Sequence, residues 1–149
     1  MAVRKIFQED SEILHKHCRE ITVFDDKLST LIDDMFETMI KANGVGLAGP
    51  QIGILRRVAV VQVDDVKIEM VNPKIIKSSG EQIGPEGCLS VDSSKNCDVL
   101  RPYKVTISAQ DRTGKPYKRT EEGFIARAIC HELDHLDGIL FYTKEYKQK

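Results

Sequence analysis

Apolar residues recur at helical spacing in a stretch near the beginning of the chain. From Asp26 to Ala42 they follow one another in steps of three and four positions, namely Leu28, Leu31, Ile32, Met35, Phe36, Met39 and Ile40. Asp25 or Asp26 can cap the start of this segment, and Asn43-Gly44 can end it. The pattern predicts an amphipathic helix with one face on the core.

A second helical pattern runs from Phe124 to Asp137, with Gly138 in the position where a left-handed residue ends a helix. Its apolar residues spread around most of the circumference, unlike those of a surface helix. They are Phe124, Ile125, Ala128, Ile129, Leu133 and Leu136. This pattern predicts a helix buried against the sheets.

Between the two helices the pattern changes to short β-rich runs. Residues 57–63 and 66–71 flank Asp64-Asp65 and predict a tight hairpin, and residues 104–110 and 116–120 predict a second one. Residues 80–100 are rich in Gly, Ser and Asp, and we expect a loop with short strand pieces there.

The stretch 44–53 contains four glycines and a proline, too many for a helix or a regular strand. It predicts a loop that approaches other backbone closely. With strands in the middle and helices at the flanks, the chain is predicted to be α+β. We expect one compact domain over residues 1–149, with antiparallel or mixed strands packed around the buried C-terminal helix.

Composition narrows the possible partners. The 22 basic and 23 acidic residues are well mixed and give a net charge of −1, so no nucleic-acid surface is indicated. No apolar stretch reaches the ~18 residues of a membrane helix, and the N-terminus lacks a secretory signal. We expect a cytoplasmic monomer whose four cysteines are free thiols rather than disulfides.

The C-terminal helix carries the motif HExxH. His131 and His135 are four residues apart and share one helix face, so both imidazoles can bind one metal ion. Glu132 beside them can reach a metal-bound water. Little chain follows the motif, so we expect the third metal ligand to come from earlier in the sequence.

Three cysteines are candidates for that ligand. Cys130 precedes His131 directly, so its side chain points about 100° away from the histidine face. Cys97 lies among polar residues, whereas Cys88 follows Gly87, which lets the backbone come close. Cys88 is the preferred ligand.

Three motifs together resemble those of one family. They are Gly44-Val45-Gly46-Leu47-Ala48-Gly49-Pro50-Gln51, Glu86-Gly87-Cys88-Leu89-Ser90 and His131-Glu132-Leu133-Asp134-His135. In order and spacing they are similar to the motifs of peptide deformylases, and the likeness covers nearly the whole chain. An HExxH alone arises by chance fairly often, but the three motifs together do not.

The resemblance implies a metal held by Cys88, His131 and His135. Fe²⁺ is the usual ion of the family, and Zn²⁺, Ni²⁺ or Co²⁺ can replace it. A sulfur with two imidazoles suits zinc on geometric grounds, so the Fe²⁺ expectation comes from the resemblance alone. The implied reaction removes the N-formyl group from the N-terminal formyl-methionine of nascent polypeptides at the ribosome and releases formate.

The resemblance also implies roles for further residues. Glu132 would move the proton from water to the departing amine, while the Gln51 side-chain amide and the Leu89 backbone N–H would form an oxyanion hole. The remaining implied residues bind substrate. Val45, Phe124, Arg127 and Ala128 would surround the methionine side chain, and Gly44, Gly46, Glu86 and Gly87 would hold the peptide backbone as an added strand.

Several expectations concern neighbouring charges. The aliphatic stem of Arg127 is expected to line the pocket while its guanidinium reaches solvent. Two roles are open for Glu86. It is either a surface charge, or it fixes its own loop or forms a hydrogen bond with one of the metal ligands. Asp134 is expected to support the site by pairing with Arg101.

Departures from the family pattern leave alternatives open. Cys130 stands where glutamine is usual, Gly49 where alanine is usual, and Asp92 where proline is usual. These differences would fit a catalytically weakened paralogue that binds formylated peptides. An HExxH endopeptidase is a second rival, but Phe141 stands where the metzincin pattern has its third histidine, which argues against it.

Overall fold

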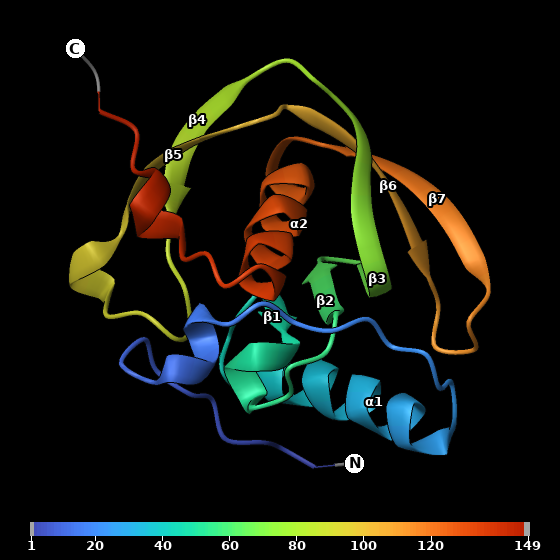
Figure 1. Ribbon diagram of the computed structural model, residues 1–149. Helices are drawn as coiled ribbons and strands as arrows, with labels where there is room; N and C mark the ends of the chain where they lie inside the picture. Colours follow the sequence, from blue (N-terminus) through green and yellow to red (C-terminus); the bar gives the residue numbers. More distant parts are fainter. Residues whose placement is uncertain (1, 148–149) are drawn as a thin grey trace.

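A five-stranded antiparallel sheet with one helix on each face forms the centre of the protein (Figure 1). The computed structural model describes residues 2–147; residue 1 and residues 148–149, at the edges of the expected domain, lie outside the described residues. The strand order is β1-β2-β3-β6-β7. The strands are β1 (Gly46–Ala48), β2 (Val58–Val63), β3 (Val66–Ser79), β6 (Lys104–Gln110) and β7 (Pro116–Glu122).

The second sheet is a two-stranded ribbon. It pairs β4 (Gln82–Glu86) with β5 (Cys97–Arg101), antiparallel, with Glu86 opposite Cys97. The expectation of a loop with short strand pieces over residues 80–100 was therefore incomplete, because the segment contains a regular hairpin. In Figure 1 this ribbon stands on one side of α2, and β3, β6 and β7 lie on the other side.

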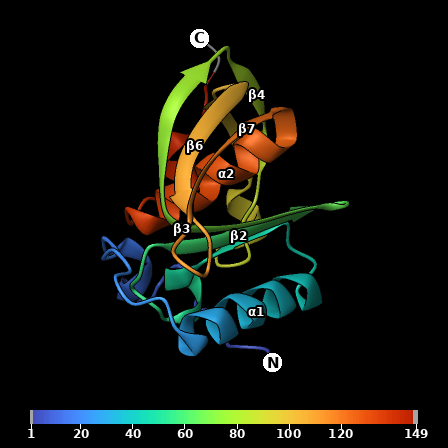
Figure 2. The same cartoon turned by 90° about the vertical axis from the view of Figure 1, so that its right-hand side faces the viewer.

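Helix α1 (Asp26–Lys41) covers one face of the sheet, as Figure 2 shows from the side. The Asp25 carboxylate accepts a hydrogen bond from the Leu28 backbone N–H at 3.1 Å and caps the helix. Asn43 has a φ of +60° just beyond the C-terminus. The predicted amphipathic helix is confirmed, although Ile40 in the predicted apolar stripe is exposed.

Helix α2 (Gly123–Leu136) lies on the other face of the sheet, between it and the β4–β5 ribbon. Ten of its fourteen residues are buried, which confirms the predicted burial, although Phe124 of the predicted apolar set is exposed. Gly138 has a φ of +76°, and a Cβ there would lie 2.8 Å from the carbonyl carbon of His15. Glycine is required at that position on both grounds.

Strand β2 contributes to the cores on both faces of the sheet. Ala59 and Val61 pack with α2, whereas Val58 and Val60 pack with α1, and all four are fully buried. The alternation follows from the two-residue period of a strand. It explains why this run is apolar at successive positions rather than at alternate ones.

The two predicted hairpins are confirmed. β2 turns into β3 through Asp64, whose φ is +52°, and β6 turns into β7 through residues 111–115. The glycine-rich stretch 44–53 contains the short strand β1 and one 3-10 turn, so it is more regular than a plain loop. None of the helices found between residues 2 and 147 has the length and apolar character of a membrane span.

Candidate metal centre and active site

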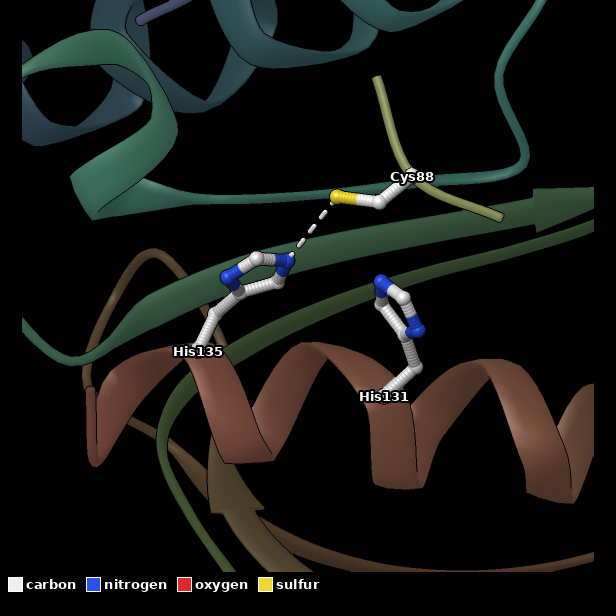
Figure 3. A group of neighbouring side chains, drawn as sticks. All are labelled: Cys88, His131 and His135. Carbon is white, nitrogen blue, oxygen red and sulfur yellow. Dashed lines mark hydrogen bonds between the residues drawn. The ribbon is translucent and has the colours of Figure 1, made fainter. Parts of the chain in front are cut away.

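A thiol and two imidazoles converge between α2 and the loop that follows β4 (Figure 3). The ligand atoms offered by Cys88, His131 and His135 all lie within 4.8 Å of one another, and Cys88 Sγ is 3.3 Å from His135 Nε2. Both histidines rise from successive turns of α2 toward Cys88. Cys97 and Cys130 are not part of this cluster.

The donor atoms fit a divalent ion. One sulfur and two ring nitrogens are the combination that transition metals of intermediate softness prefer in proteins. Burial is the largest effect on His135 and, with the positive charges of His131 and Arg101, it lowers the pKa of His135 to about 3. Its ring is therefore neutral near pH 7 and offers a lone pair.

Glu86 fixes the orientation of His131. The Nδ1 atom of His131 lies 2.9 Å from Glu86 Oε1. Because a carboxylate can only accept, Nδ1 carries a proton, and Nε2 is the ring nitrogen that can bind the shared ion once it has lost its own proton. Burial acts to lower the pKa of His131, but hydrogen bonds with Cys88 and Glu86 outweigh it and raise that pKa to about 10.

The same carboxylate is held by two arginines. Arg101 donates to both of its oxygens at 2.8 and 2.9 Å, and Arg127 donates to one at 2.7 Å. Burial alone would raise the pKa of Glu86, yet Arg101 and His131 lower it to about 2. Glu86 is thus a buried anion at neutral pH that contacts a candidate ligand, and the surface-charge alternative is wrong.

Two expectations about neighbouring charges are settled by these contacts. Arg101 donates to Asp134 at 2.7 Å, so the expected pair is formed. The guanidinium of Arg127 does not reach solvent, because it also donates to the carbonyls of Gly84 and Val99 at 3.1 and 3.0 Å. That expectation was wrong, since β4 and β5 supply acceptors that cover the side chain.

Glu132 lies beside the cluster with its carboxylate nearly enclosed. Its Oε1 atom has no hydrogen-bond partner among residues 2–147. Burial raises the pKa of Glu132 to about 7, against the opposing positive charge of His131. A Cβ at position 46 would lie 2.4 Å from Glu132 Oε2, so Gly46 leaves the space that this carboxylate occupies.

Gln51 and Leu89 lie on the other side of the cluster. The Gln51 Oε1 atom accepts from the Ala48 backbone N–H at 2.9 Å, which directs its Nε2 atom toward Cys88 Sγ at 3.5 Å and Ser90 Oγ at 3.1 Å. The backbone N–H of Leu89 makes no hydrogen bond to another residue of the described chain. Both donors border the same cavity.

That cavity has a volume of about 340 Å³. Every residue expected to bind substrate lines it, namely Gly44, Val45, Gly46, Glu86, Gly87, Phe124, Arg127 and Ala128. No sequence pattern pointed to five further lining residues, which are Asn43, Pro85, Val91, Ser93 and Asn96. Asn96 packs on Gly87, where a Cβ would meet its side chain at 3.0 Å, a contact that only the β4–β5 hairpin creates.

The cavity opens along an unpaired strand edge. β1 is the first strand of the five-stranded sheet and pairs on one side only, with β2. Gly46 lies on this strand and also lines the cavity. The free edge therefore offers main-chain hydrogen bonds to an extended peptide.

The three departures from the family pattern have local explanations. Cys130 is buried in the core on the α2 face, and burial raises its pKa to about 11. A Cβ at Gly49 would lie 2.7 Å from the Ile54 carbonyl oxygen, so alanine would clash here. Asp92 accepts from the Ser94 backbone N–H at 2.8 Å and caps a short 3-10 turn (Ser93–Lys95).

Comparison with known proteins gives a consistent answer. The family model described as polypeptide deformylase matches residues 3–149. Peptide deformylase 1 of Bacillus subtilis is 50% identical over 146 residues, which cover 97% of this chain and 91% of that protein. The peptide deformylase of Acetivibrio thermocellus is also 50% identical, over 97% of this chain and 84% of its own.

Solved structures agree with the sequence relatives. The peptide deformylase of Thermotoga maritima matches with a TM-score of 0.94 at 32% identity, covering 97% of this chain and 99% of that one. The chain belongs to the peptide deformylase family. The Legionella pneumophila enzyme matches with a TM-score of 0.91 at 44% identity, covering 97% and 86% of the two chains.

Family membership confirms several predictions. The predicted family and α+β fold hold, and the chain is a hydrolase that acts on amide bonds in N-terminal processing of proteins. Peptide deformylases are metal-dependent, and the three clustered side chains give this chain a place where a metal ion can bind. All four cysteines are free, as expected.

Proposed function

We propose that Cys88, His131 and His135 hold one divalent ion, Fe²⁺, and that the chain uses it to remove the formyl group from N-terminal formyl-methionine. The products are formate and a free α-amine. The observation that carries the proposal is the convergence of these three side chains, of which Cys88 and His131 line the same cavity as Glu132. When bound, the ion supplies Lewis-acid polarisation and acidifies a water molecule.

Glu132 is proposed as the group that moves the proton. Its carboxylate faces the cavity, and the unpartnered Oε1 atom is available to accept a proton from the attacking water. The same oxygen then donates that proton to the nitrogen of the departing amine as the C–N bond breaks. A pKa near 7 suits both steps at neutral pH.

Gln51 and Leu89 are proposed to stabilise the charge that develops on the formyl oxygen. The Gln51 Nε2 atom and the Leu89 backbone N–H border the cavity close to Cys88. The Gln51 amide is held in place before the reaction begins, because its side-chain oxygen Oε1 accepts a hydrogen bond from the Ala48 backbone N–H. Preorganised donors of this kind lower the barrier without reorganisation.

The substrate methionine is proposed to enter the apolar side of the cavity, formed by Val45, Phe124 and Ala128. The following peptide backbone would lie along the free edge of β1, between residues 44–46 and 86–87. Main-chain hydrogen bonding reads no later side chain, so the chain would accept many different peptides. This tolerance suits nascent chains at the ribosome, and we propose a cytoplasmic, monomeric enzyme.

The proposed reaction is tested by formate release from formyl-Met-Ala-Ser with protein loaded with Fe²⁺ under anaerobic conditions. The matched control is Glu132→Gln, which keeps the shape and removes the base. We expect the variant to bind metal and to lose a factor of about 10² to 10⁴ in kcat. Equal turnover in the two proteins would favour the weakened, peptide-binding paralogue, and cleavage of internal peptide bonds would favour an endopeptidase.

The oxyanion role is tested by Gln51→Leu. Removing one preformed donor typically costs about 3 kcal/mol of barrier lowering, so kcat is expected to fall by roughly two orders of magnitude. Metal content, measured by atomic emission on the same samples, is expected to stay at one ion per chain. Loss of the ion would instead show that Gln51 acts through its contact with Cys88.

The choice of Fe²⁺ is tested by metal analysis of protein purified without oxygen. Iron at one equivalent per chain supports the proposal, and zinc or nickel at that level contradicts it. In air, the iron form is expected to lose activity faster than the nickel form, because Fe²⁺ and the Cys88 thiolate are both oxidisable. Equal loss in the two forms would point to a cause other than iron oxidation.

A further inference from the structure

Residues 7–9 cross over both loops that supply the proposed oxyanion donors, and we propose that this segment, the N-terminal brace, holds the two donors at a fixed separation. The inference rests on the proposed function, because it concerns the same two donors. None of the three brace residues lines the cavity, so they act as positioning residues rather than catalytic ones.

The first contact of the brace is with the turn that carries Gln51. The backbone N–H of Phe7 donates to the Gln51 carbonyl at 2.7 Å. The Phe7 ring covers Gly53, where an added Cβ would lie 3.2 Å from the ring. Gly53 ends the 3-10 turn (Gly49–Ile52) in a left-handed conformation with a φ of +85°. The brace therefore fixes both the main chain of Gln51 and the end of its turn.

The second contact is with the turn that carries Cys88 and Leu89. Gln8 donates from its side-chain amide to the Leu89 carbonyl at 3.3 Å, and the Glu9 backbone N–H donates to the Ser90 carbonyl at 2.8 Å. The turn has one hydrogen bond of its own, from the Val91 N–H to the Cys88 carbonyl at 3.1 Å. Its two central carbonyls are thus held from outside, by consecutive residues of the brace.

The Glu9 side chain anchors the brace to the far end of the same loop. Its carboxylate accepts from the Asp92 backbone N–H at 3.3 Å and from the Tyr142 hydroxyl at 3.4 Å, and it pairs with Lys95. The Lys95 ammonium also lies 4.6 Å from the centre of the Tyr142 ring. These groups form one cluster at the end of the 88–92 loop.

A fixed separation matters because the donors come from distant parts of the chain. Gln51 and Leu89 have to converge on one developing oxygen within about 0.5 Å for full effect. Apart from the brace, the two loops are linked by side-chain contacts of Gln51 with Ser90 and Cys88. The brace adds the main-chain link, from the Gln51 carbonyl through residues 7–9 to the carbonyls of Leu89 and Ser90.

The test compares the double variant Gln8→Ala/Glu9→Ala with a matched control, Asp10→Ala/Glu12→Ala, in full-length protein loaded with Ni²⁺. Asp10 and Glu12 are close in sequence to the brace, and neither is buried. In the brace variant we expect kcat for formyl-Met-Ala-Ser to fall about tenfold with KM within twofold, because donor placement is changed rather than substrate binding. The control is expected to keep wild-type kcat and KM.

Amide hydrogen exchange supplies a readout that does not depend on activity. In the brace variant, exchange of the peptide covering residues 88–92 is expected to be at least about fivefold faster, with metal content unchanged. A third variant, Glu9→Gln, keeps the acceptors for Asp92 and Tyr142 and is expected to recover most of the kcat that Glu9→Ala loses. A merely structural role would lower Tm while leaving kcat per folded molecule unchanged.

Two results would contradict the proposed positioning role of the N-terminal brace. One is unchanged exchange over residues 88–92 in the double variant, and the other is faster exchange with wild-type kcat. A wild-type protein that releases no formate would instead overturn the proposed function. In that case the exchange measurement alone decides whether residues 7–9 hold the 88–92 loop.

Discussion

The helices α1 and α2 cover opposite faces of the same sheet but bury very different side chains. In α1, seven of sixteen residues are buried, and the solvent side carries charges such as Lys27 and Lys41. In α2, ten of fourteen residues are buried, and these include Arg127, His131 and Glu132. Helix α1 holds the fold mainly by apolar contact, whereas α2 carries polar groups that would destabilise a core if they lacked partners.

The difference is explained by what lies beyond each helix. The outer side of α1 carries exposed charges and suits an amphipathic pattern, and its two buried polar residues, Asp34 and Thr38, accept hydrogen bonds from residues 2 and 4. The outer side of α2 faces the β4–β5 ribbon, from which Glu86 and Arg101 reach its polar residues. A helix covered on both sides can thus carry buried ionisable groups when a neighbouring strand supplies their partners.

The largest effect should come from neutralising Glu86, whose carboxylate contacts Arg127 and His131 on α2. Glu86→Gln leaves the buried Arg127 without its anion and Arg101 with Asp134 alone, and we expect about 3–5 kcal/mol of destabilisation. Metal affinity should fall about 10- to 100-fold, because His131 loses its orienting carboxylate. Urea unfolding and competition with a metal chelator measure the two effects.

The matched control for that variant is Glu69→Gln, which weakens a partly exposed ion pair with Arg112 outside the cluster. It is expected to cost at most about 1 kcal/mol and to leave metal affinity unchanged. Similar losses in both variants would contradict a special role for the carboxylate at position 86.

A truncation in the α1 core should separate stability from activity. Ile32 is fully buried against the sheet, and Ile32→Ala is expected to cost about 2–4 kcal/mol in the free energy of unfolding. Since α1 supplies no group to the cluster, kcat per folded molecule should remain at the wild-type value. The comparison variant is Ile129→Ala on α2, where the side chain is equally buried. This variant should reduce both the free energy of unfolding and kcat. A clear fall of kcat in the Ile32 variant would show that α1 also controls the site.

The smallest effect should come from the α1 cap. Asp25→Ala removes the acceptor for the Leu28 N–H and is expected to cost about 1 kcal/mol. The thermal midpoint should fall by a few degrees, and formate release should be unchanged. Asp25→Asn keeps an acceptor and serves as the control, so an equal loss in both variants would exclude capping as the cause.

Local patterns predicted the parts of the fold that local physics determines. The helical spacing of Leu28 to Met39, the Asp64 turn and Gly138 all gave correct elements, because each depends on neighbours in sequence. The β4–β5 hairpin was missed because Gly84 and Pro85 weaken the strand signal. Its stability comes from pairing with residues 97–101.

In the candidate site, too, features that depend on neighbours in sequence were predicted, and features that depend on distant contacts were not. Motif spacing pointed to Cys88, His131 and His135, since i and i+4 on a helix fix two of the three positions. The buried guanidinium of Arg127 was not predictable, because its acceptors Glu86 and Val99 lie 41 and 28 positions away. Contacts of the N-terminal brace are equally remote in sequence.

The alternating side chains of β2 have a consequence for how the molecule comes apart. Val60 serves one core and Ala59 the other, so a fault in this strand loosens α1 and α2 together. The two halves are therefore expected to open as one cooperative unit rather than in sequence. Amides of β2 should then be among the slowest to exchange in the whole chain, at a rate set by global unfolding.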